Sequence, residues 1–176
     1  KYLKGVFIKT LPTKIRELIR ERGIRNTCVN TQAPVGTTSL LANVSSGIEP
    51  IFAPVYERKY YSGDERKAEI IADELFSNFK NDGIETNHFE GAYDVSPEAH
   101  LAIQEAAQMY IDSSISKTCN LPEDFNDENF SELLLKYISN IKGVTVYRDG
   151  SRGDSPLTPL SLDEFKNRGF LELVWN

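Results

Sequence analysis

One short run, Ala33 to Leu41 (APVGTTSLL), combines a bend with three consecutive hydroxyl side chains. If a strand ends before this bend and a helix begins after it, unpaired N–H groups at the start of the helix attract an anion. Gly36 lets the main chain approach that anion, because no Cβ stands in the way. The run therefore predicts a phosphate-binding loop made of Pro34, Val35, Gly36, Thr37, Thr38 and Ser39.

The loop is not a Walker motif, because the GxxxxGK[ST] spacing and its lysine are missing. Transfer of a γ-phosphoryl group is therefore not indicated. Taken alone, the run also fits an ordinary N-capped helix with no ligand, and this local alternative stays open.

The elements around the loop alternate between helical and extended patterns. We expect helices over 12–23, 37–42, 64–79, 96–110 and 127–141, and extended segments within 24–33, 43–63, 113–122 and 144–151. The helix ends follow from Pro12, Gly23, Ser96 and Gly143. Such alternation implies parallel β/α units, whose ligands gather at the carboxyl ends of the strands.

Three of these helices carry an apolar stripe that we expect to face the core. In the first it comprises Ala68, Ile71, Ala72, Leu75, Phe76 and Phe79. In the second it comprises Ala99, Ala102, Ile103, Ala106, Ala107 and Tyr110. In the third it comprises Phe130, Leu134, Tyr137, Ile138 and Ile141.

Three segments, in this order and spacing, resemble a known family. They are APVGTTSLLANVSSGIEP, DVSPEAHLAIQEAAQMYIDSSISKTCNLP and IKGVTVYRDGSR. They resemble the C-terminal part of the large catalytic chain of ribonucleotide reductase, in its adenosylcobalamin-dependent branch. The family carries AP-T-G-T-I-S, N-x-S-S-G-I-E-P, S-I-S-K-T and T-x-Y-R-D-G-S-R, from which Val35 and Thr38 depart.

The resemblance covers residues 25–152 and implies the C-terminal half of a ten-stranded α/β barrel. Residues 1–24 would form a leading helix and residues 153–176 a C-terminal tail, within one partial-barrel domain. It also implies that Pro34–Ser39 hold the diphosphate or triphosphate of a ribonucleotide. The family replaces the ribose 2′-hydroxyl by hydrogen through a thiyl radical on the cysteine of N-x-C-x-E, and that motif is not in this chain.

The two cysteines do not supply the missing chemistry. Asn26 and Cys28 have the right spacing, but Asn30 replaces the glutamate, and the family's radical cysteine lies well upstream. We expect Cys28 and Cys119 to be buried and reduced, because no CxxC pair or nearby histidine accompanies them. His88 and His100 are expected on a loop or a helix surface.

Other polar residues have two readings each. For Tyr147 a packing or hydrogen-bonding role is favoured over a radical path. Arg148, Asp149 and Arg152 would form an ion-pair turn or hold an anionic cofactor edge. Lys117 would face the nucleotide or extend from a strand edge to solvent. Glu49 would accept a backbone or hydroxyl hydrogen bond.

Composition limits the remaining possibilities. The chain has 176 residues, and 20 Lys and Arg against 26 Asp and Glu give a net charge of −6. We therefore expect no nucleic-acid partner. No apolar run reaches the length of a membrane span, and no signal peptide is recognised at the start, so we expect no membrane partner and a cytoplasmic location.

Three hypotheses follow for the whole protein. In the first, the chain is a split subunit that gives the phosphate loop and half the barrel to a companion carrying the radical cysteine and most contacts to adenosylcobalamin. In the second, it is a noncatalytic nucleotide-binding or regulatory subunit. In the third, it is an excerpt of a longer polypeptide. The first is preferred, because a half barrel leaves sheet edges and apolar helix faces open to water.

Overall fold

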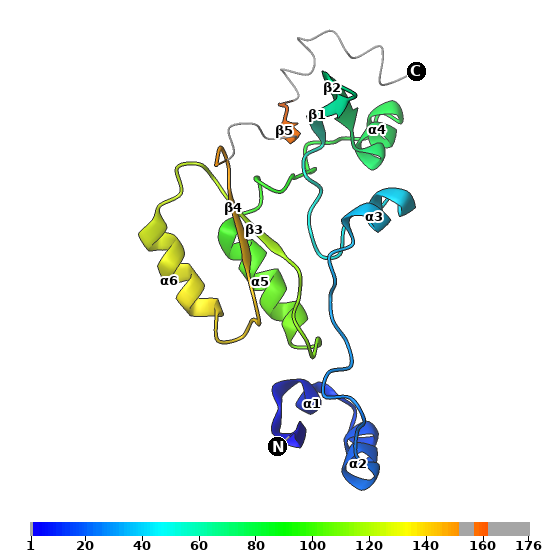
Figure 1. Cartoon of the computed structure of the whole chain (residues 1–176), viewed down its shortest axis with the longest axis vertical. Helices are drawn as coiled ribbons and strands as arrows, with labels where there is room; N and C mark the ends of the chain where they lie inside the picture. Colours follow the sequence, from blue (N-terminus) through cyan, green and yellow to red (C-terminus); the bar gives the residue numbers. More distant parts are fainter. Residues whose placement is uncertain (1, 152–156, 162–176) are drawn as a thin grey trace.

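The computed structural model describes residues 2–151 and 157–161. The helices are η1 (Tyr2–Lys4), α1 (Val6–Thr10), α2 (Thr13–Arg22), α3 (Gly36–Ala42), α4 (Glu74–Asn81), α5 (Pro97–Gln108) and α6 (Asp127–Tyr137). The strands are β1 (Val55–Ser62), β2 (Glu65–Ala72), β3 (Thr118–Leu121), β4 (Thr145–Arg148) and β5 (Leu157–Pro159). Helices α1 and α2 lie at one end of the molecule and the β1–β2 hairpin at the other (Figure 1).

The parallel part of the fold is built on β3 and β4, which pair from Thr118↔Thr145 to Leu121↔Arg148. The segment before the predicted phosphate loop runs parallel to the chain leading into β3, through a bridge between Gln32 and Ile115. The strand expected within 24–33 is thus reduced to one bridge. This segment is largely exposed, so little packing supports a longer ladder.

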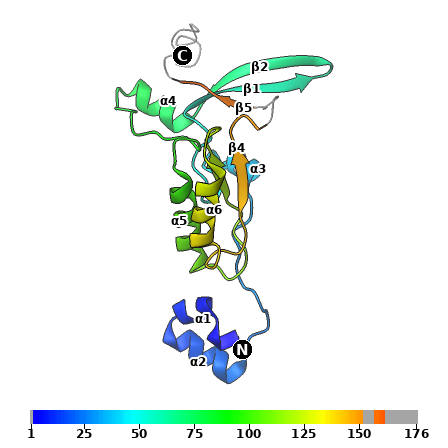
Figure 2. The same ribbon diagram turned by 90° about the vertical axis from the view of Figure 1, so that its left-hand side faces the viewer.

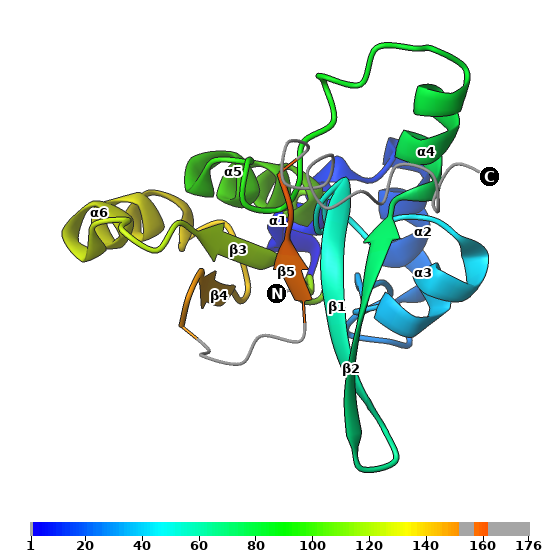
Figure 3. The same cartoon turned by 90° about the horizontal axis from the view of Figure 1, so that it is seen from above.

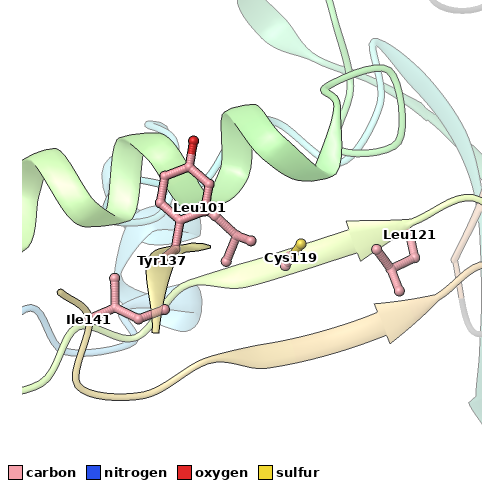
Figure 4. Packing of buried hydrophobic residues seen from close by; sticks show 5 residues of the cluster. All are labelled: Leu101, Cys119, Leu121, Tyr137 and Ile141. Carbon is pink, nitrogen blue, oxygen red and sulfur yellow. The ribbon is translucent and has the colours of Figure 1, made fainter. Parts of the chain in front are cut away.

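Side chains of α5, β3 and α6, together with Ile141, form the main hydrophobic core (Figure 4). The core comprises Leu101, Cys119, Leu121, Tyr137 and Ile141. Tyr137 and Ile141 were expected to face inward and do so. Ile138, the C-cap of α6, was also expected there but is 51% exposed.

The buried face of α5 is not the stripe expected from the sequence. Ile103 and Tyr110 are exposed, and the buried side chains are Pro97, His100, Leu101, Gln104 and Gln108. The prediction was wrong because the alanine-rich face and a polar stripe share the same helical spacing. In this helix the polar stripe is buried, since it binds backbone groups of neighbouring loops.

The helix expected over 64–79 was also wrong. Residues 65–72 form β2, which pairs antiparallel with β1 from Val55↔Ala72 to Ser62↔Glu65. The turn holds Gly63 at φ 66°, a conformation that glycine adopts at little cost. Helix α4 starts only after Asp73, whose side chain accepts a hydrogen bond from the Phe76 amide.

The β1–β2 hairpin extends well beyond the rest of the fold (Figures 2 and 3). Strand β5 pairs with the base of β1, from Tyr56↔Pro159 to Arg58↔Leu157. A second small core fills this base and comprises Val55, Phe76 and Leu160, with Phe89 packed against it. The hairpin is therefore anchored at one end only.

Several expected helix ends are confirmed, but α6 ends at Tyr137 and not at residue 141. Helix α2 ends at Gly23, which has φ 77°. Ser96 caps α5 by accepting a hydrogen bond from the Ala99 amide, and Asn126 caps α6. None of the described helices is long and apolar enough to cross a membrane.

Candidate functional site

The predicted phosphate loop lies on the surface at the start of α3. Pro34, Gly36, Thr37 and Thr38 are exposed, and Val35 is half-buried. Residues 36–38 occupy the first turn, where backbone N–H groups have no acceptor within the helix. A Cβ on Gly36 would meet nothing within 4 Å. The loop thus offers amides and two exposed hydroxyls on a surface open to a ligand.

Ser39 differs from its two neighbours. Its side chain is buried, its hydroxyl donates to the Gly36 carbonyl at 2.7 Å, and its amide donates to the Val35 carbonyl at 2.8 Å. The Ser39 hydroxyl hydrogen therefore stabilises the turn itself. Of the three predicted hydroxyl donors, only those of Thr37 and Thr38 face solvent.

The segment that follows α3 carries Glu49, a half-buried carboxylate that forms an ion pair with the buried Lys117. Lys117, 2% exposed, places its Nζ 2.6 Å from Oε2 of Glu49. The other Glu49 oxygen accepts a hydrogen bond from the Thr118 amide at 2.6 Å. The role expected of Glu49, as an acceptor from backbone, is confirmed. The expectation that Lys117 reaches solvent is wrong, because its charge is satisfied inside the protein.

His100 completes this network from α5. Its Nδ1 lies 2.8 Å from Lys117 Nζ, and its Nε2 lies 2.9 Å from the Ala92 carbonyl oxygen. His100 is buried, so its expected place on a loop or helix surface is wrong. Burial lowers the pKa of the imidazole, the hydrogen bond with Ala92 opposes this, and the Lys117 charge lowers the pKa further.

The remaining polar residues of the α5 stripe hold backbone groups. Gln104 donates to the Gly143 carbonyl at 2.6 Å, and Gln108 donates to the carbonyls of Ile111 and Ser113 at 2.8 Å. Asp112, just beyond the helix, accepts from the Val29 amide at 2.9 Å. This stripe was not predicted, although the spacing of four between His100, Gln104, Gln108 and Asp112 was the signal for it.

The alanine-rich side of α5 lines an open apolar groove of about 560 Å³. Ile48 and Pro50 form its other wall, and His100 and Lys117 also contribute to the lining. Ile103 is 51% exposed here. The stripe expected to be buried is thus uncovered within the described part of the chain.

The cysteines behave differently from each other. Cys119 is buried as expected, and burial raises the pKa of its thiol to about 11. Cys28 is exposed, so the expectation that it is buried is wrong; the whole segment 21–31 lies on the surface. Among residues 2–151 and 157–161, no three His, Cys, Asp or Glu side chains gather closely enough to hold a metal ion.

Arg148 orders the turn between β3 and α6. Its guanidinium donates to the carbonyls of Glu123 and Phe125 at 3.0 and 2.7 Å and forms an ion pair with Asp127. An ion-pair turn was expected with Asp149 and Arg152. The partner is instead Asp127, and Arg152 lies outside the described residues. Tyr147 is partly exposed on β4.

Comparison with known proteins assigns the chain to a family. The family model described as the ribonucleotide reductase barrel domain matches residues 8–147. This chain belongs to the ribonucleotide reductase family. The fold class expected from the sequence, part of the α/β barrel of ribonucleotide reductase, is confirmed.

Individual relatives agree with this assignment. A vitamin B12-dependent ribonucleoside-diphosphate reductase of Thermoplasma acidophilum is 32% identical over 157 residues, which cover 77% of this chain and 20% of that protein. The protein of the same description from Mycobacterium tuberculosis CDC 1551 is 30% identical over 150 residues, covering 73% of this chain and 22% of the relative. The chain therefore spans about a fifth of the length of these ribonucleotide reductases.

Two solved structures share the fold. A B-12 dependent (class II) ribonucleotide reductase superposes with a TM-score of 0.56 at 20% identity, covering 81% of this chain and 23% of that chain. The class Id ribonucleotide reductase alpha subunit of Actinobacillus ureae gives a TM-score of 0.54 at 18% identity, covering 76% and 29%.

Proposed function

We propose that this chain supplies the substrate phosphate-binding loop and part of the barrel to a ribonucleotide reductase. That enzyme would reduce ribonucleoside di- or triphosphates to deoxyribonucleotides by a radical mechanism and serve DNA replication in the cytoplasm. The observation that carries the proposal is the exposed first turn of α3, with Gly36, Thr37 and Thr38 open to solvent, in a chain of this family. A phosphate there would accept backbone N–H and hydroxyl hydrogen bonds.

The radical chemistry would come from elsewhere. Cys28 lacks the N-x-C-x-E context, and Cys119 is packed in the hydrophobic core with Leu101 and Tyr137, away from any substrate. We propose that a companion chain, or another segment of one longer polypeptide, carries the radical cysteine. The open apolar groove beside Ile103 supports this, because exposed apolar helix faces of this kind mark contact surfaces.

The same companion would hold adenosylcobalamin, which supplies the initiating radical when bound. The described residues do not fit this cofactor. Both ring nitrogens of His100 are engaged, and the exposed His88 lies against the rings of Phe79 and Phe89.

Gly36→Val tests the phosphate loop in the complete protein, assembled with the companion. A Cβ at this position has no neighbour within 4 Å, so we expect the substitution to leave the fold intact and to hinder an approaching phosphate. We expect the Kd for a ribonucleoside diphosphate to rise roughly tenfold or more, as on loss of a charge-assisted hydrogen bond. Equal affinity in the two proteins would remove the phosphate-loop assignment.

Gly143→Val is the matched control. Gly143 also has no neighbour within 4 Å of a Cβ, and it lies between α6 and β4, away from the loop. We expect this variant to bind nucleotide as the unaltered protein does. A noncatalytic nucleotide-binding or regulatory subunit is the alternative. It would be indicated if purification from the native source yielded the chain alone, soluble and still able to bind nucleotide.

A further inference from the structure

Residues 33–46, which include the phosphate loop and α3, form one excursion of the chain from the rest of the protein, and its two ends meet. Gln32 lies in the stem by which the chain enters this excursion, and Gly47 lies in the stem by which it leaves. A Cβ on Gly47 would lie 2.8 Å from Nε2 of Gln32, so the two stems are in direct contact. Gly47 has φ 56°, which favours glycine. The chain between them therefore behaves as one closed loop.

Both stems are fixed to the same short segment, 114–118. On the entering side, the Ser116 amide donates to the Gln32 carbonyl at 2.9 Å, and the Thr31 hydroxyl donates to the Ser114 carbonyl at 2.8 Å. On the leaving side, the Glu49 carboxylate accepts from the Thr118 amide and from Lys117. The entering stem is held by hydrogen bonds between neutral groups, and the leaving stem is held by the ion pair between Glu49 and Lys117.

The ammonium group of Lys117, which holds the leaving stem, has an acceptor for each of its hydrogens. The Lys117 ammonium has three hydrogens and three acceptors, namely Glu49 Oε2 at 2.6 Å, His100 Nδ1 at 2.8 Å and the Thr118 carbonyl at 2.7 Å. Charge-assisted hydrogen bonds inside a protein are stronger than neutral ones. The ion pair between Glu49 and Lys117 therefore fixes the leaving stem of the excursion to segment 114–118.

We infer that Glu49, held by Lys117, is a positioning residue for phosphate binding by the loop at Pro34–Ser39. This inference rests on the proposed phosphate-binding function of that loop. The Glu49 carboxylate accepts hydrogen bonds from Lys117 and Thr118, so its effect on the loop would pass through the leaving stem. A loop that is already fixed loses little freedom when its amides bind phosphate, whereas a loosened loop must be ordered at that moment.

Glu49→Gln in the complete protein is the test, with inorganic pyrophosphate as the binding probe. Glutamine keeps the size and one acceptor oxygen but removes the charge that pairs with Lys117. We expect the Kd for pyrophosphate, measured by calorimetry, to rise about tenfold. In turnover, KM for the ribonucleotide should rise by a similar factor while kcat changes less than twofold. A merely structural residue would not separate KM from kcat in this way.

The surface pair between α5 and α6 provides a matched control. Lys136 Nζ and Glu98 Oε1 are also 2.6 Å apart, but both side chains are exposed and lie far along the chain from the loop. Glu98→Gln should leave the Kd for pyrophosphate unchanged. If Glu49→Gln alone does not fold, Glu49→Gln with Lys117→Met removes both charges, and the same rise in Kd is expected.

The outcomes separate this inference from the proposed function. If the unaltered protein does not bind pyrophosphate, or if Gly36→Val binds it equally well, the phosphate loop itself is wrong. If the unaltered protein binds and Gly36→Val weakens binding, but folded Glu49 variants bind normally, the positioning role of Glu49 is wrong. A rise in Kd in the Glu98→Gln control would also overturn it.

Discussion

Nδ1 of His100 lies 2.8 Å from Nζ of Lys117, and this contact determines the protonation of the ring. The lysine ammonium can only donate, so Nδ1 must accept. Nε2 then carries the ring proton and donates to the Ala92 carbonyl oxygen. A second proton would bring two positive charges together in a buried site. The neutral imidazole is therefore the form that the fold stabilises.

The first prediction is a loss of stability in mild acid. The folded-state pKa of His100 is lowered from 6.5, so the unfolded chain binds a proton more readily than the folded one. The contribution of the neutral ring is fully present above the unfolded pKa. It declines as the pH falls below about 6.5 toward the lower folded pKa. Thermal unfolding between pH 7.5 and 5 measures this decline.

The chain's second histidine serves as the control for this experiment. His100→Gln should flatten the pH dependence in that window, because glutamine can still accept from Lys117 and donate to a carbonyl without titrating. His88→Gln, at an exposed position, should leave the dependence in place. The explanation fails if His100→Gln retains the full decline.

The second prediction concerns the two thiols. Burial raises the pKa of Cys119 to about 11, so at pH 8 only about one molecule in a thousand carries its thiolate. Cys28 is exposed. Iodoacetamide at pH 8 should therefore label Cys28 in the native protein, and Cys119 only after denaturant is added. Peptide mass analysis at increasing times measures both rates, and rapid native labelling of Cys119 would contradict its burial.

Helix ends were the most predictable part of the fold. Gly23 and Ser96 act within a few residues of themselves, through backbone conformation or a side-chain cap, so their effect is visible in the sequence. Gly143 was expected to end α6, but that helix ends at Tyr137. The β1–β2 hairpin was not predicted. The spacing of Ala68, Ile71 and Ala72 fits a helix, but pairing with β1, made possible by the turn at Gly63, outweighs it.

In the candidate site, too, local features were predictable from the sequence and contacts between distant positions were not. The short helix Gly36–Ala42 is a local feature, and the sequence predicted it. The ion pair between Glu49 and Lys117 joins positions 68 apart, and no local pattern indicates such a partner. The buried polar stripe on α5 had a regular spacing, but apolar Ile103 on the competing face made the wrong face look like the core.

The third prediction tests whether that polar stripe stabilises the fold. The Gln108 side chain binds three backbone groups: its Nε2 donates to the carbonyls of Ile111 and Ser113, and its Oε1 accepts from the Lys142 amide at 3.3 Å. Gln108→Met keeps the length of the side chain and removes all three bonds. Leaving buried polar groups unpaired costs about 1–3 kcal/mol each, and water can restore part of this. We expect the free energy of unfolding to fall by about 2–4 kcal/mol.

Leu135→Ala is the control for this measurement, because Leu135 is a highly exposed apolar residue on α6. Its effect should stay within about 0.5 kcal/mol, as for most surface substitutions. Chemical denaturation of both variants, compared at the same slope, gives the two differences. A loss below about 0.5 kcal/mol for Gln108→Met would mean that solvent replaces the glutamine. The buried stripe would then not be what aligns α5 with the loops at 111–113 and 142–143.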